Sequence, residues 1–382
     1  MTPAARLAAA IEILDAVIAA ARDAGAAADT VFQRYFATRR YAGSKDRRAV
    51  RDLVYAAIRS CGERPVSGRA ALIGHARAHD PALLSLFGDG PHGPAPLQDG
   101  EPEAAAGLAP AWLQGALAER FGTDVDRQLT ALLGRAPLDI RVNALKADRD
   151  DLAAAHPDWQ LLPRTAHGLR LPTGSAVEQL PEYLDGRIEV QDEGSQIAAE
   201  TVAAQPGELV VDLCAGAGGK TLALAAAMQV QGRLVACDTD RARLAQLGPR
   251  ARRAGALGIE PRLLDPGREA TALADLAGQC DAVLIDAPCS GSGTWRRNPE
   301  SRWRLTPERL TRLAATQGQL IRLGASLLRP GGRLVYVVCS LLPAEGEGQL
   351  CGLDGFQPWT HRLLTPADDG CDGFFIAQTA RL

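Results

Sequence analysis

From Leu209 onward the sequence alternates between short apolar runs and helical stretches. The runs are LVVDLC, RLVAC, DAVLID and RLVYVVC, which begin at residues 209, 233, 281 and 333. Between them, helices are expected at Lys220–Gln229, Ala242–Ala254 and Pro307–Leu328. Buried strands that alternate with helices form a mostly parallel sheet with helices on both faces. We therefore predict an α/β fold for this part of the chain.

The composition is that of a folded globular protein in which positive and negative charges nearly balance. The chain has 382 residues, of which 46% are hydrophobic and 23% are charged. These fractions are ordinary for globular proteins, and the length favours at least two domains. Because the formal net charge is −3, bulk charge neither requires nor excludes a polyanionic partner. Any nucleic-acid surface must therefore be local.

The amino-terminal residues and the cysteines indicate in which cellular compartment the protein is expected. Arg6, Glu12, Asp15 and Arg22 interrupt the apolar start of the chain before a signal peptide or membrane anchor could form. The eight cysteines lack C-x-x-C pairs, which favours reduced thiols over a disulfide framework or a metal site. They are Cys61, Cys214, Cys237, Cys280, Cys289, Cys339, Cys351 and Cys371. We expect a cytoplasmic protein with no metal and no membrane partner.

Three further segments are expected before the α/β part. Residues 1–85 show helical periodicity and should form a small helical bundle. Residues 86–107 are rich in Gly and Pro and are expected to be an interdomain linker. Residues 108–180 combine a helical pattern at Pro110–Gly122 with a strand pattern at Leu138–Ala147, which is typical of a small mixed connecting subdomain. The domain that carries the chemistry would then be 181–382.

A basic and aromatic stretch lies within the predicted helical bundle. Its cations are interleaved with Tyr35, Phe36 and Tyr41, and they are Arg34, Arg39, Arg40, Lys45, Arg47, Arg48 and Arg51. Two interpretations are open for this stretch. It is either a solvated helix face or a surface that contacts RNA.

A glycine turn follows the first strand of the α/β part. The strand LVVDLC leads into AGAGGKT at Ala215–Thr221, where a ligand can approach the backbone and the following helix offers free N–H groups. The spacing matches neither the dinucleotide fingerprint nor the P-loop. Asp238 ends the next strand and is placed to accept hydrogen bonds from a ribose, although an N-cap role is also open. Asp265 and Asp286 end two further strands, so one continuous cleft is expected.

Two cysteines lie just past strand ends on the same edge of the sheet. Cys289 follows in DAPCSGSG and Cys339 in VVCSLLPAEGE. A single buried cysteine is more often a small hydrophobic residue than a reactive one. Two cysteines at corresponding strand ends instead favour a pair that faces one ligand.

These motifs resemble those of the RsmB/Nop/Sun-type RNA (cytosine-5) methyltransferase family. The matching pieces run in family order and are RVNALK, VQDEGSQIAA, DLCAGAGGKT, ACDTD, LIDAPCSGSGTWRRNPESRW, LVYVVCS and DGFFIA. The resemblance covers roughly Arg141–Leu382. It implies a Rossmann-like S-adenosylmethionine-dependent methyltransferase domain with a mostly parallel seven-stranded sheet. The helical front part, with GSKDRRAV, looks like the all-α NusB-type RNA-binding domain of the bacterial rRNA members.

The resemblance also implies a role for each site residue. Cys339 would add to carbon-6 of cytosine, which makes carbon-5 able to attack a sulfonium methyl group, and Cys289 would assist breakdown of the adduct. Asp286 would contact the nitrogen-3 edge of the base with Lys220 close by. The cofactor S-adenosylmethionine would be held by Cys214, Ala215, Gly216, Ala217, Gly218, Gly219 and Lys220 around its methionine part, by Asp238 at the ribose, by Asp265 at the adenine, and by Asp286.

A second arginine-rich stretch, TWRRNPESRWR, follows the Cys289 loop. Arg296, Arg297, Arg302 and Arg304 lie around Trp295 and Trp303, which suits phosphate contact and base stacking. A salt-bridge cluster on a helix surface is the alternative interpretation.

The sequence departs from the family pattern at two places. Gly216–Gly219 reads Gly-Ala-Gly-Gly where members usually have Ala-Pro-Gly-Gly, and Val338 replaces a threonine before the nucleophile. Neither change removes a required reactive group.

We therefore expect a monomeric RNA cytosine-5 methyltransferase that acts on small-subunit rRNA. A tRNA methyltransferase with the same core and a non-catalytic RNA-binding assembly factor are the alternatives. An amino-methylating enzyme is disfavoured, since the [DN]-P-P-[YF] motif of that chemistry is absent at 286–289, which reads Asp-Ala-Pro-Cys.

Overall fold

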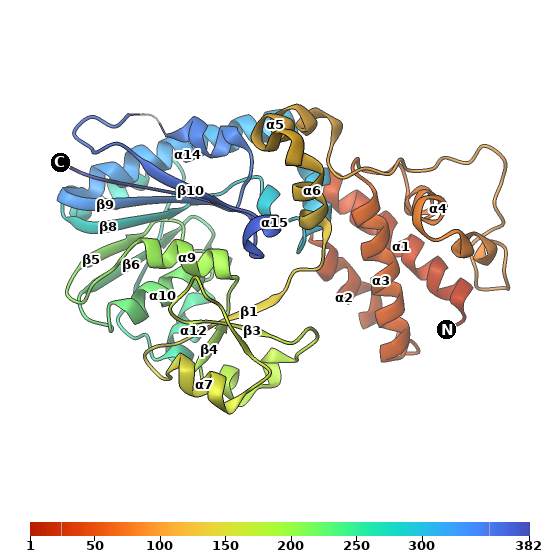
Figure 1. The fold of residues 1–382 in the computed structure, drawn as a ribbon, viewed down its shortest axis with the longest axis horizontal. Coiled ribbons are helices and arrows are strands. Elements are labelled where there is room, and N and C mark those ends of the chain that lie inside the picture. Colours follow the sequence, from red (N-terminus) through yellow and green to blue (C-terminus); the bar gives the residue numbers. More distant parts are fainter. Residues whose placement is uncertain (24, 351) are drawn as a thin grey trace. The chain divides into compact units, whose positions relative to one another are not determined.

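The structure, a computed structural model, describes residues 1–23, 25–350 and 352–382 (Figure 1). Cys351 therefore lies outside the described residues. The chain forms two compact units, which are considered separately below. The first contains Met1–Arg135 and Ser290–Arg309, and the second contains Ala136–Cys289 and Leu310–Leu382.

The second unit is built on a seven-stranded sheet of order β10-β11-β9-β8-β5-β6-β7. The strands β5 to β9 pair in parallel, and β10 and β11 add antiparallel pairs at one edge. Their bounds are β5 Leu209–Asp212, β6 Arg233–Asp238, β7 Glu260–Leu263, β8 Cys280–Asp286, β9 Leu328–Val338, β10 Thr360–Leu364 and β11 Phe374–Ala380. This arrangement confirms the predicted α/β class and the mostly parallel seven-stranded sheet.

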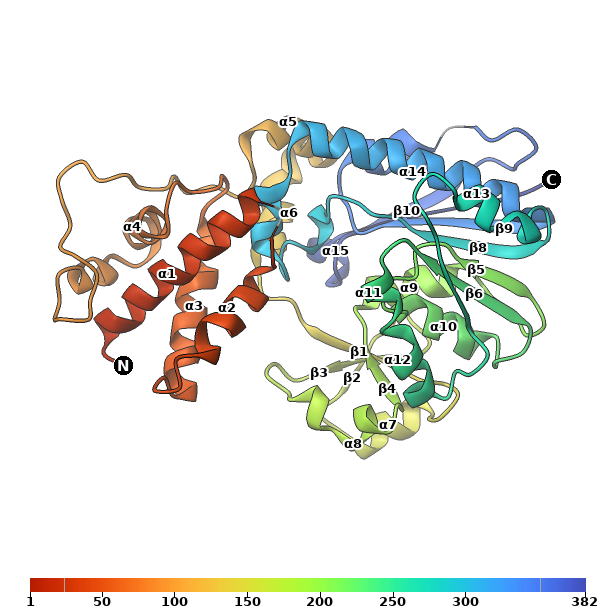
Figure 2. The same cartoon turned by 180° about the vertical axis from the view of Figure 1, so that it is seen from behind.

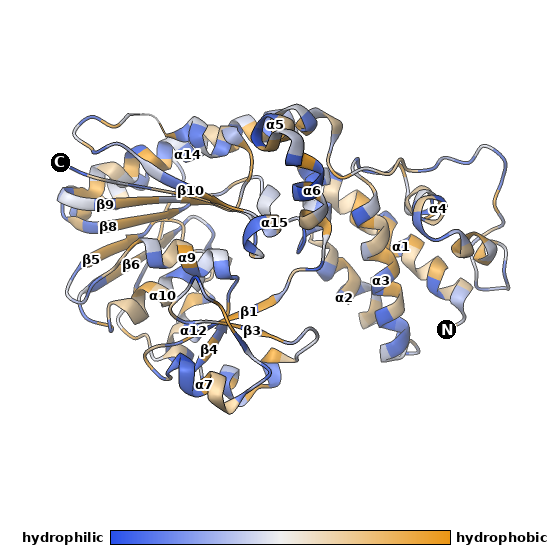
Figure 3. Ribbon diagram, viewed as in Figure 1, coloured by the Kyte–Doolittle hydropathy of each residue, from blue (hydrophilic) through white to orange (hydrophobic). Residues whose placement is uncertain are grey.

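Alternating side chains of each central strand fill two cores, one on each face of the sheet. Val210 packs with residues of α9 (Glu193–Thr201), α10 (Gly219–Ala227) and α12 (Leu247–Ala254). Its neighbour Val211 packs with residues of α14 (Pro307–Leu327) on the other face. Figure 2 shows this layering from behind, and Figure 3 shows the strongly hydrophobic central strands. Because helices cover both faces of the sheet, the sequences of these strands are continuous apolar runs.

A smaller antiparallel sheet of order β2-β3-β1-β4 completes the second unit. Its strands are β1 Leu138–Val142, β2 Gln160–Leu161, β3 Gly168–Leu171 and β4 Ile188–Val190, and it carries the short helices α7 (Arg149–Ala155) and α8 (Pro181–Leu184). The predicted boundary at residue 180 is wrong, because β4 pairs with β1 and belongs to the same sheet. Asn143 and Lys146 of the RVNALK motif donate to the carbonyls of Ala254 and Arg253 at the end of α12.

The first unit is helical, as predicted. It contains α1 (Pro3–Arg22), α2 (Ala28–Ala37), α3 (Ser44–Ser60), α4 (Gly68–His79), α5 (Ala111–Phe121) and α6 (Val125–Leu133), with a 3-10 turn at Pro81–Leu86. Leu7, Leu14, Val54 and Ile58 form its core with neighbours from the first four helices. Since the unit extends to Arg135, α5 and α6 belong to it and not to the predicted connecting subdomain.

The Gly/Pro-rich segment 86–107 packs within the first unit, so the predicted interdomain linker is wrong. It has little regular structure, as its composition indicates. Glu101 nevertheless pairs with Arg69 at 2.6 Å, and Glu103 pairs with Arg77 at 2.7 Å. Backbone hydrogen bonds from Ala104 to Ala70 and from Gly107 to Ser60 fix its end.

The segment Ser290–Arg309, distant in sequence, joins the first unit through the ends of its helices. Glu300 Oε1 accepts from the N–H of Ala28 at the start of α2 at 3.0 Å. Arg302 Nη2 donates to the carbonyls of Ile58 and Cys61 at the end of α3, at 2.6 and 2.7 Å, and Arg304 donates to the carbonyls of Gly25 and Ala26. An anion at a helix start and a cation at a helix end both match the helix dipole.

These contacts correct the RNA roles predicted for Arg302, Trp303 and Trp295. Arg302 is 0% exposed and its terminal nitrogens are occupied by backbone carbonyls. Trp303 packs in the core of the first unit and donates to the carbonyl of Cys61 at 3.0 Å, while Trp295 is 0% exposed. None of the three side chains has a surface to offer to a phosphate or a base. This burial could not be predicted from the sequence, because the partners of Arg302 lie 194 to 244 residues away in the chain.

Arg302→Met is expected to lower the free energy of unfolding of the first unit by about 3 kcal/mol, because it leaves several buried carbonyls without a donor. Arg304→Met, whose side chain is partly exposed, should cost about 1 kcal/mol. Urea denaturation of both variants checks this. An Arg302→Met variant as stable as wild type, with weakened RNA binding, would restore the RNA role.

Candidate active site

The two predicted cysteines meet at one edge of the large sheet. Cys289 follows β8 and Cys339 follows β9, and their sulfur atoms lie 3.4 Å apart. Both side chains are half-buried. The parallel register pairs Asp286 with Val337, so the loops that carry the cysteines leave the sheet side by side. The predicted pairing of these residues at one edge is present in the structure.

A buried polar network ties the two cysteine loops together. Gln317 Nε2, from α14, donates to the carbonyl of Pro288 at 2.9 Å and to Glu345 Oε1 at 3.0 Å. Glu345 Oε2 in turn accepts from the hydroxyl of Ser340 at 2.6 Å. Gln317 and Glu345 are fully buried. Sequence reasoning missed both, because a polar residue on a long helix and an acidic residue after a strand carry no distinctive local signal.

Lys220 and Asp286 form an ion pair beside the cysteines. Lys220 Nζ lies 2.8 Å from Asp286 Oδ2, and its ammonium also lies 5.4 Å from the ring centre of Phe374. Burial lowers the pKa of Lys220, but the charge and hydrogen bond of Asp286 outweigh burial and raise it overall. Cys339 also interacts electrostatically with this ammonium. The site therefore keeps a fixed positive charge near the sulfur predicted to be nucleophilic.

Asp212, at the end of β5, is a site residue that sequence reasoning missed. Its Oδ2 accepts from the hydroxyl of Thr221 at 2.6 Å, whereas no described residue hydrogen-bonds to its buried Oδ1. Burial raises the pKa of Asp212 to about 7, and the charge of Asp286 adds to this direction. The signal that could have found it is an acidic residue at the end of the strand that leads into the glycine turn.

The glycine turn has the geometry of a ligand-binding loop. Gly216 and Gly218 have φ angles of +55° and +89°, in the region that glycine adopts most readily. Gly216 N–H donates to Asp238 Oδ2 at 2.7 Å, which links the turn to the end of β6. A Cβ atom added at Gly219 would meet no atom within 4 Å. Open space over the start of α10 leaves room for a small molecule.

The other predicted cofactor residues surround this turn. Ala215 is nearly buried and hydrogen-bonds to Cys237 through the backbone. Burial raises the pKa of the Cys214 thiol well above its usual value, so it remains protonated. Asp238 also accepts from Asp240 N–H at 2.7 Å, so its carboxylate orders two loops. Asp265 lies exposed just after β7.

The remaining predicted RNA-contacting residues lie in the first unit. Arg296 is nearly buried, and Arg297 and Arg304 are partly exposed. In the part of the chain that the structure describes, no helix is long and apolar enough to cross a membrane. Among the same residues, no cluster of three His, Cys, Asp or Glu side chains could hold a metal ion.

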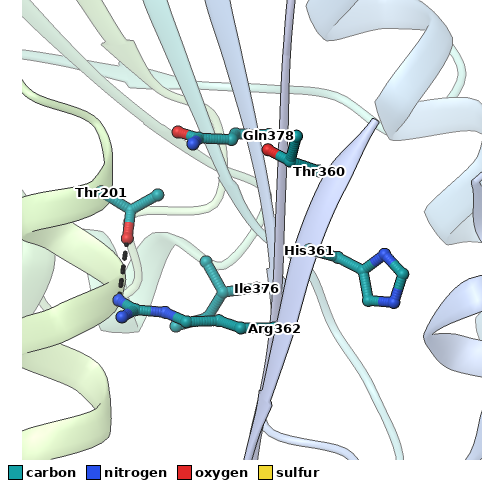
Figure 4. A pocket seen from close by; sticks show the side chains of 6 residues that line it. All are labelled: Thr201, Thr360, His361, Arg362, Ile376 and Gln378. Atoms are coloured by element: carbon teal, nitrogen blue, oxygen red, sulfur yellow. Dashed lines mark hydrogen bonds between the residues drawn. The ribbon is translucent and has the colours of Figure 1, made fainter. Parts of the chain in front are cut away.

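A cavity of about 360 Å³ opens along β10 and β11, away from these residues (Figure 4). Thr201, Thr360, His361, Arg362, Ile376 and Gln378 line it. Arg362 donates to the hydroxyl of Thr201 at 3.2 Å, and His361 points to the opposite side of the strand. None of the lining residues belongs to the glycine turn or to the cysteine loops.

Asp212→Asn is expected to flatten the pH dependence of stability. The folded-state pKa of about 7 lies above that of an unfolded aspartate, so the folded state binds the extra proton. Stability from this group is therefore present below the unfolded pKa and is lost as pH rises through 7. From pH 5 to 8 wild type should lose about 2 kcal/mol more than Asp212→Asn. Urea denaturation at both pH values measures this, with the exposed Asp265→Asn as control. Equal losses in Asp212→Asn and wild type would refute it.

Comparisons with known proteins place the chain among methyltransferases. The family described as "16S rRNA methyltransferase RsmB/F" matches residues 199–353. The probable ribosomal RNA small subunit methyltransferase B of Synechocystis is 37% identical over 299 residues, which cover 70% of this chain and 66% of that protein. The Vibrio cholerae ribosomal RNA small subunit methyltransferase B is 30% identical over 289 residues, covering 71% and 65%. The chain thus spans just under two thirds of the length of these curated relatives.

Solved structures share the fold. The crystal structure of PH0851 has a TM-score of 0.74 at 22% identity and covers 99% of both chains. A methyltransferase homologue from Pyrococcus horikoshii has a TM-score of 0.62 at 27% identity and covers 72% of this chain and 96% of its own. The fold is therefore the Rossmann-like fold of methyltransferases. With its motifs in order and its relatives named, the chain is a member of the RsmB/Nop/Sun-type methyltransferase family.

Proposed function

We propose that this protein methylates carbon-5 of a cytosine in RNA, with S-adenosylmethionine as the methyl donor and small-subunit rRNA as the substrate. The observation that carries the proposal is the 3.4 Å approach of Cys289 and Cys339 beside the Lys220–Asp286 ion pair. Chemistry at the amino group of a base needs no thiol, whereas carbon-5 must first be activated by a nucleophile at carbon-6. The family membership and the rRNA methyltransferase names of the relatives support the choice of RNA.

The residues present fit a cationic cofactor. Among the described residues, no hydrogen-bond partner is found for one buried carboxylate oxygen of Asp212, and Asp286 and Asp238 end β8 and β6, the two strands that flank β5. The space over Gly219 is open. We place the methionine part at 214–220, the ribose at Asp238 and the adenine near Asp265. When bound, the cofactor supplies an electrophilic methyl group on a sulfonium sulfur.

The chain's own residues would carry the remaining steps. Cys339 adds as a thiolate to carbon-6 of the cytosine, while Asp286 hydrogen-bonds the nitrogen-3 edge and Lys220 orients Asp286. The added sulfur makes carbon-5 nucleophilic. After methylation, Cys289, acting as a thiolate base, takes the proton from carbon-5, the carbon–sulfur bond breaks, and Cys339 leaves as a thiolate. Cys289 then releases this proton to the solvent, which returns both cysteines to their starting state.

The helical first unit is proposed to bind RNA as a NusB-like domain. Four exposed cations of its basic stretch, Arg34, Arg40, Lys45 and Arg48, make no ion pair with any described residue. Tyr41 beside them is 72% exposed. Arg39 and Arg51 are instead paired with Glu12 and Asp29. The stretch thus contains some arginines that pair within the unit and four cations that can contact phosphates. With rRNA as the substrate, we also propose a cytoplasmic location.

Cys339→Ala is expected to reduce methyl transfer to rRNA by at least about 10³-fold, because the nucleophile is lost. Cys289→Ala should instead accumulate a protein–RNA adduct that survives denaturing electrophoresis. Cys61→Ala, in the core of the first unit, is the control and should methylate normally. Full turnover by Cys339→Ala would refute the mechanism. If wild type transferred methyl groups to tRNA and not to rRNA, the proposed substrate would be wrong.

Replacing the four unpaired cations together by Ala should weaken RNA binding and make it less dependent on salt. The slope of log K for RNA binding against log[salt] is negative. If two to four of these cations contact phosphates, the magnitude of this slope decreases by about 1 to 3. Fluorescence anisotropy with an rRNA fragment at several salt concentrations measures this. Arg77→Ala, which removes an exposed arginine paired with Glu103, should leave the slope unchanged. An unaltered slope in the fourfold variant would show that the stretch is a solvated helix face.

A further inference from the structure

The glycine turn at 216–219 has little stiffness of its own. Gly216 and Gly218 flank Ala217, and both adopt positive φ angles, so the free chain has many other conformations to populate. Within the turn, the N–H of Gly218 donates to the carbonyl of Ala215 at 2.9 Å. Holding this backbone in one conformation before a ligand arrives requires contacts from outside the turn.

One such contact comes from α12. Arg250 Nη1 donates to the carbonyl of Ala217 at 2.8 Å, at the centre of the turn. The same guanidinium donates through Nη2 to Glu189 Oε2 at 2.9 Å. Because a guanidinium is planar and rigid, fixing one end of it fixes the direction of the other. The position of the Ala217 carbonyl therefore depends on the contact between Arg250 and Glu189.

Glu189 is held in the small sheet and is almost completely buried. It lies on β4, is 2% exposed, and also accepts a hydrogen bond from Arg253. Arg141, its register partner on β1, adds a further positive charge nearby. A buried carboxylate is stable only when cations and hydrogen bonds compensate its lost hydration. The surrounding arginines meet this condition, and the pairing of β4 with β1 fixes the backbone of Glu189.

We propose that Glu189 and Arg250 are positioning residues that hold the 216–219 turn in its cofactor-binding conformation. The inference rests on the proposed use of S-adenosylmethionine, and it adds a link from the small sheet to the cofactor loop. Glu189 orients Arg250, and Arg250 fixes the Ala217 carbonyl. A loop held in advance loses less conformational entropy when its ligand binds, which increases affinity.

The experiment compares Arg250→Met with Arg253→Met. Both variants remove one arginine from Glu189. Arg253, however, donates to Glu189 and lies 4.1 Å from the ring centre of Tyr183, and among the described residues its side chain makes no hydrogen bond to the turn. Isothermal titration calorimetry with S-adenosylmethionine should show about tenfold weaker binding for Arg250→Met and a change of less than about twofold for Arg253→Met. Arg250→Lys, which can reach one partner but not both, should lie between wild type and Arg250→Met.

Hydrogen exchange of the protein without cofactor provides a second measurement. Amides of residues 214–221 should exchange faster in Arg250→Met and in Glu189→Gln, and in Arg253→Met they should exchange as in wild type. Unchanged affinity and exchange in Arg250→Met would overturn the inference, as would equal losses in Arg253→Met. Failure of wild type to bind S-adenosylmethionine would instead contradict the proposed cofactor, while the exchange comparison would still decide whether Arg250 positions the turn.

Discussion

The parallel register between β8 and β9 is the constraint on which the site depends. Asp286 lies opposite Val337, so Cys289 and Cys339 emerge from neighbouring strands at the same edge. Parallel strands all point their carboxyl ends to one edge, and β5 and β6 bring the glycine turn and Asp238 to that edge as well. A shift of one residue in this pairing would turn one cysteine away from the other.

The charges at this edge are arranged for a cation and for a reactive sulfur. Asp212, Asp286 and Asp238 contribute carboxylates, and Lys220 is the ammonium paired with Asp286. The burial of Asp212 costs stability near neutral pH, which the large apolar cores on both faces of the sheet offset. A buried ionisable group that lowers stability is typical of a functional site, where the group serves function and not folding.

Features that depend on local hydrophobic periodicity and on the positions of strand ends could be predicted from the sequence. Features that depend on contacts between residues far apart in the chain could not. The apolar runs located the sheet, and the positions of Cys289 and Cys339 just past two runs located the pair. Arg302 was assigned to RNA because its neighbours are basic and aromatic. Its true partners, the carbonyls at the end of α3, lie over 240 residues away. The segment 86–107 similarly looked like a linker, because no local pattern reveals the ion pairs from Glu101 and Glu103 to α4.

Nucleophilic attack by Cys339 can be tested by trapping the covalent intermediate. RNA that contains 5-fluorocytidine at the target position can accept the thiolate and the methyl group, but it has no proton at carbon-5 to release, so the adduct cannot break down. Mass spectrometry of the digested complex would identify the modified peptide. We expect a covalent bond to Cys339 that forms only with S-adenosylmethionine present and withstands denaturation. A bond to Cys289, or no covalent complex at all, would contradict it.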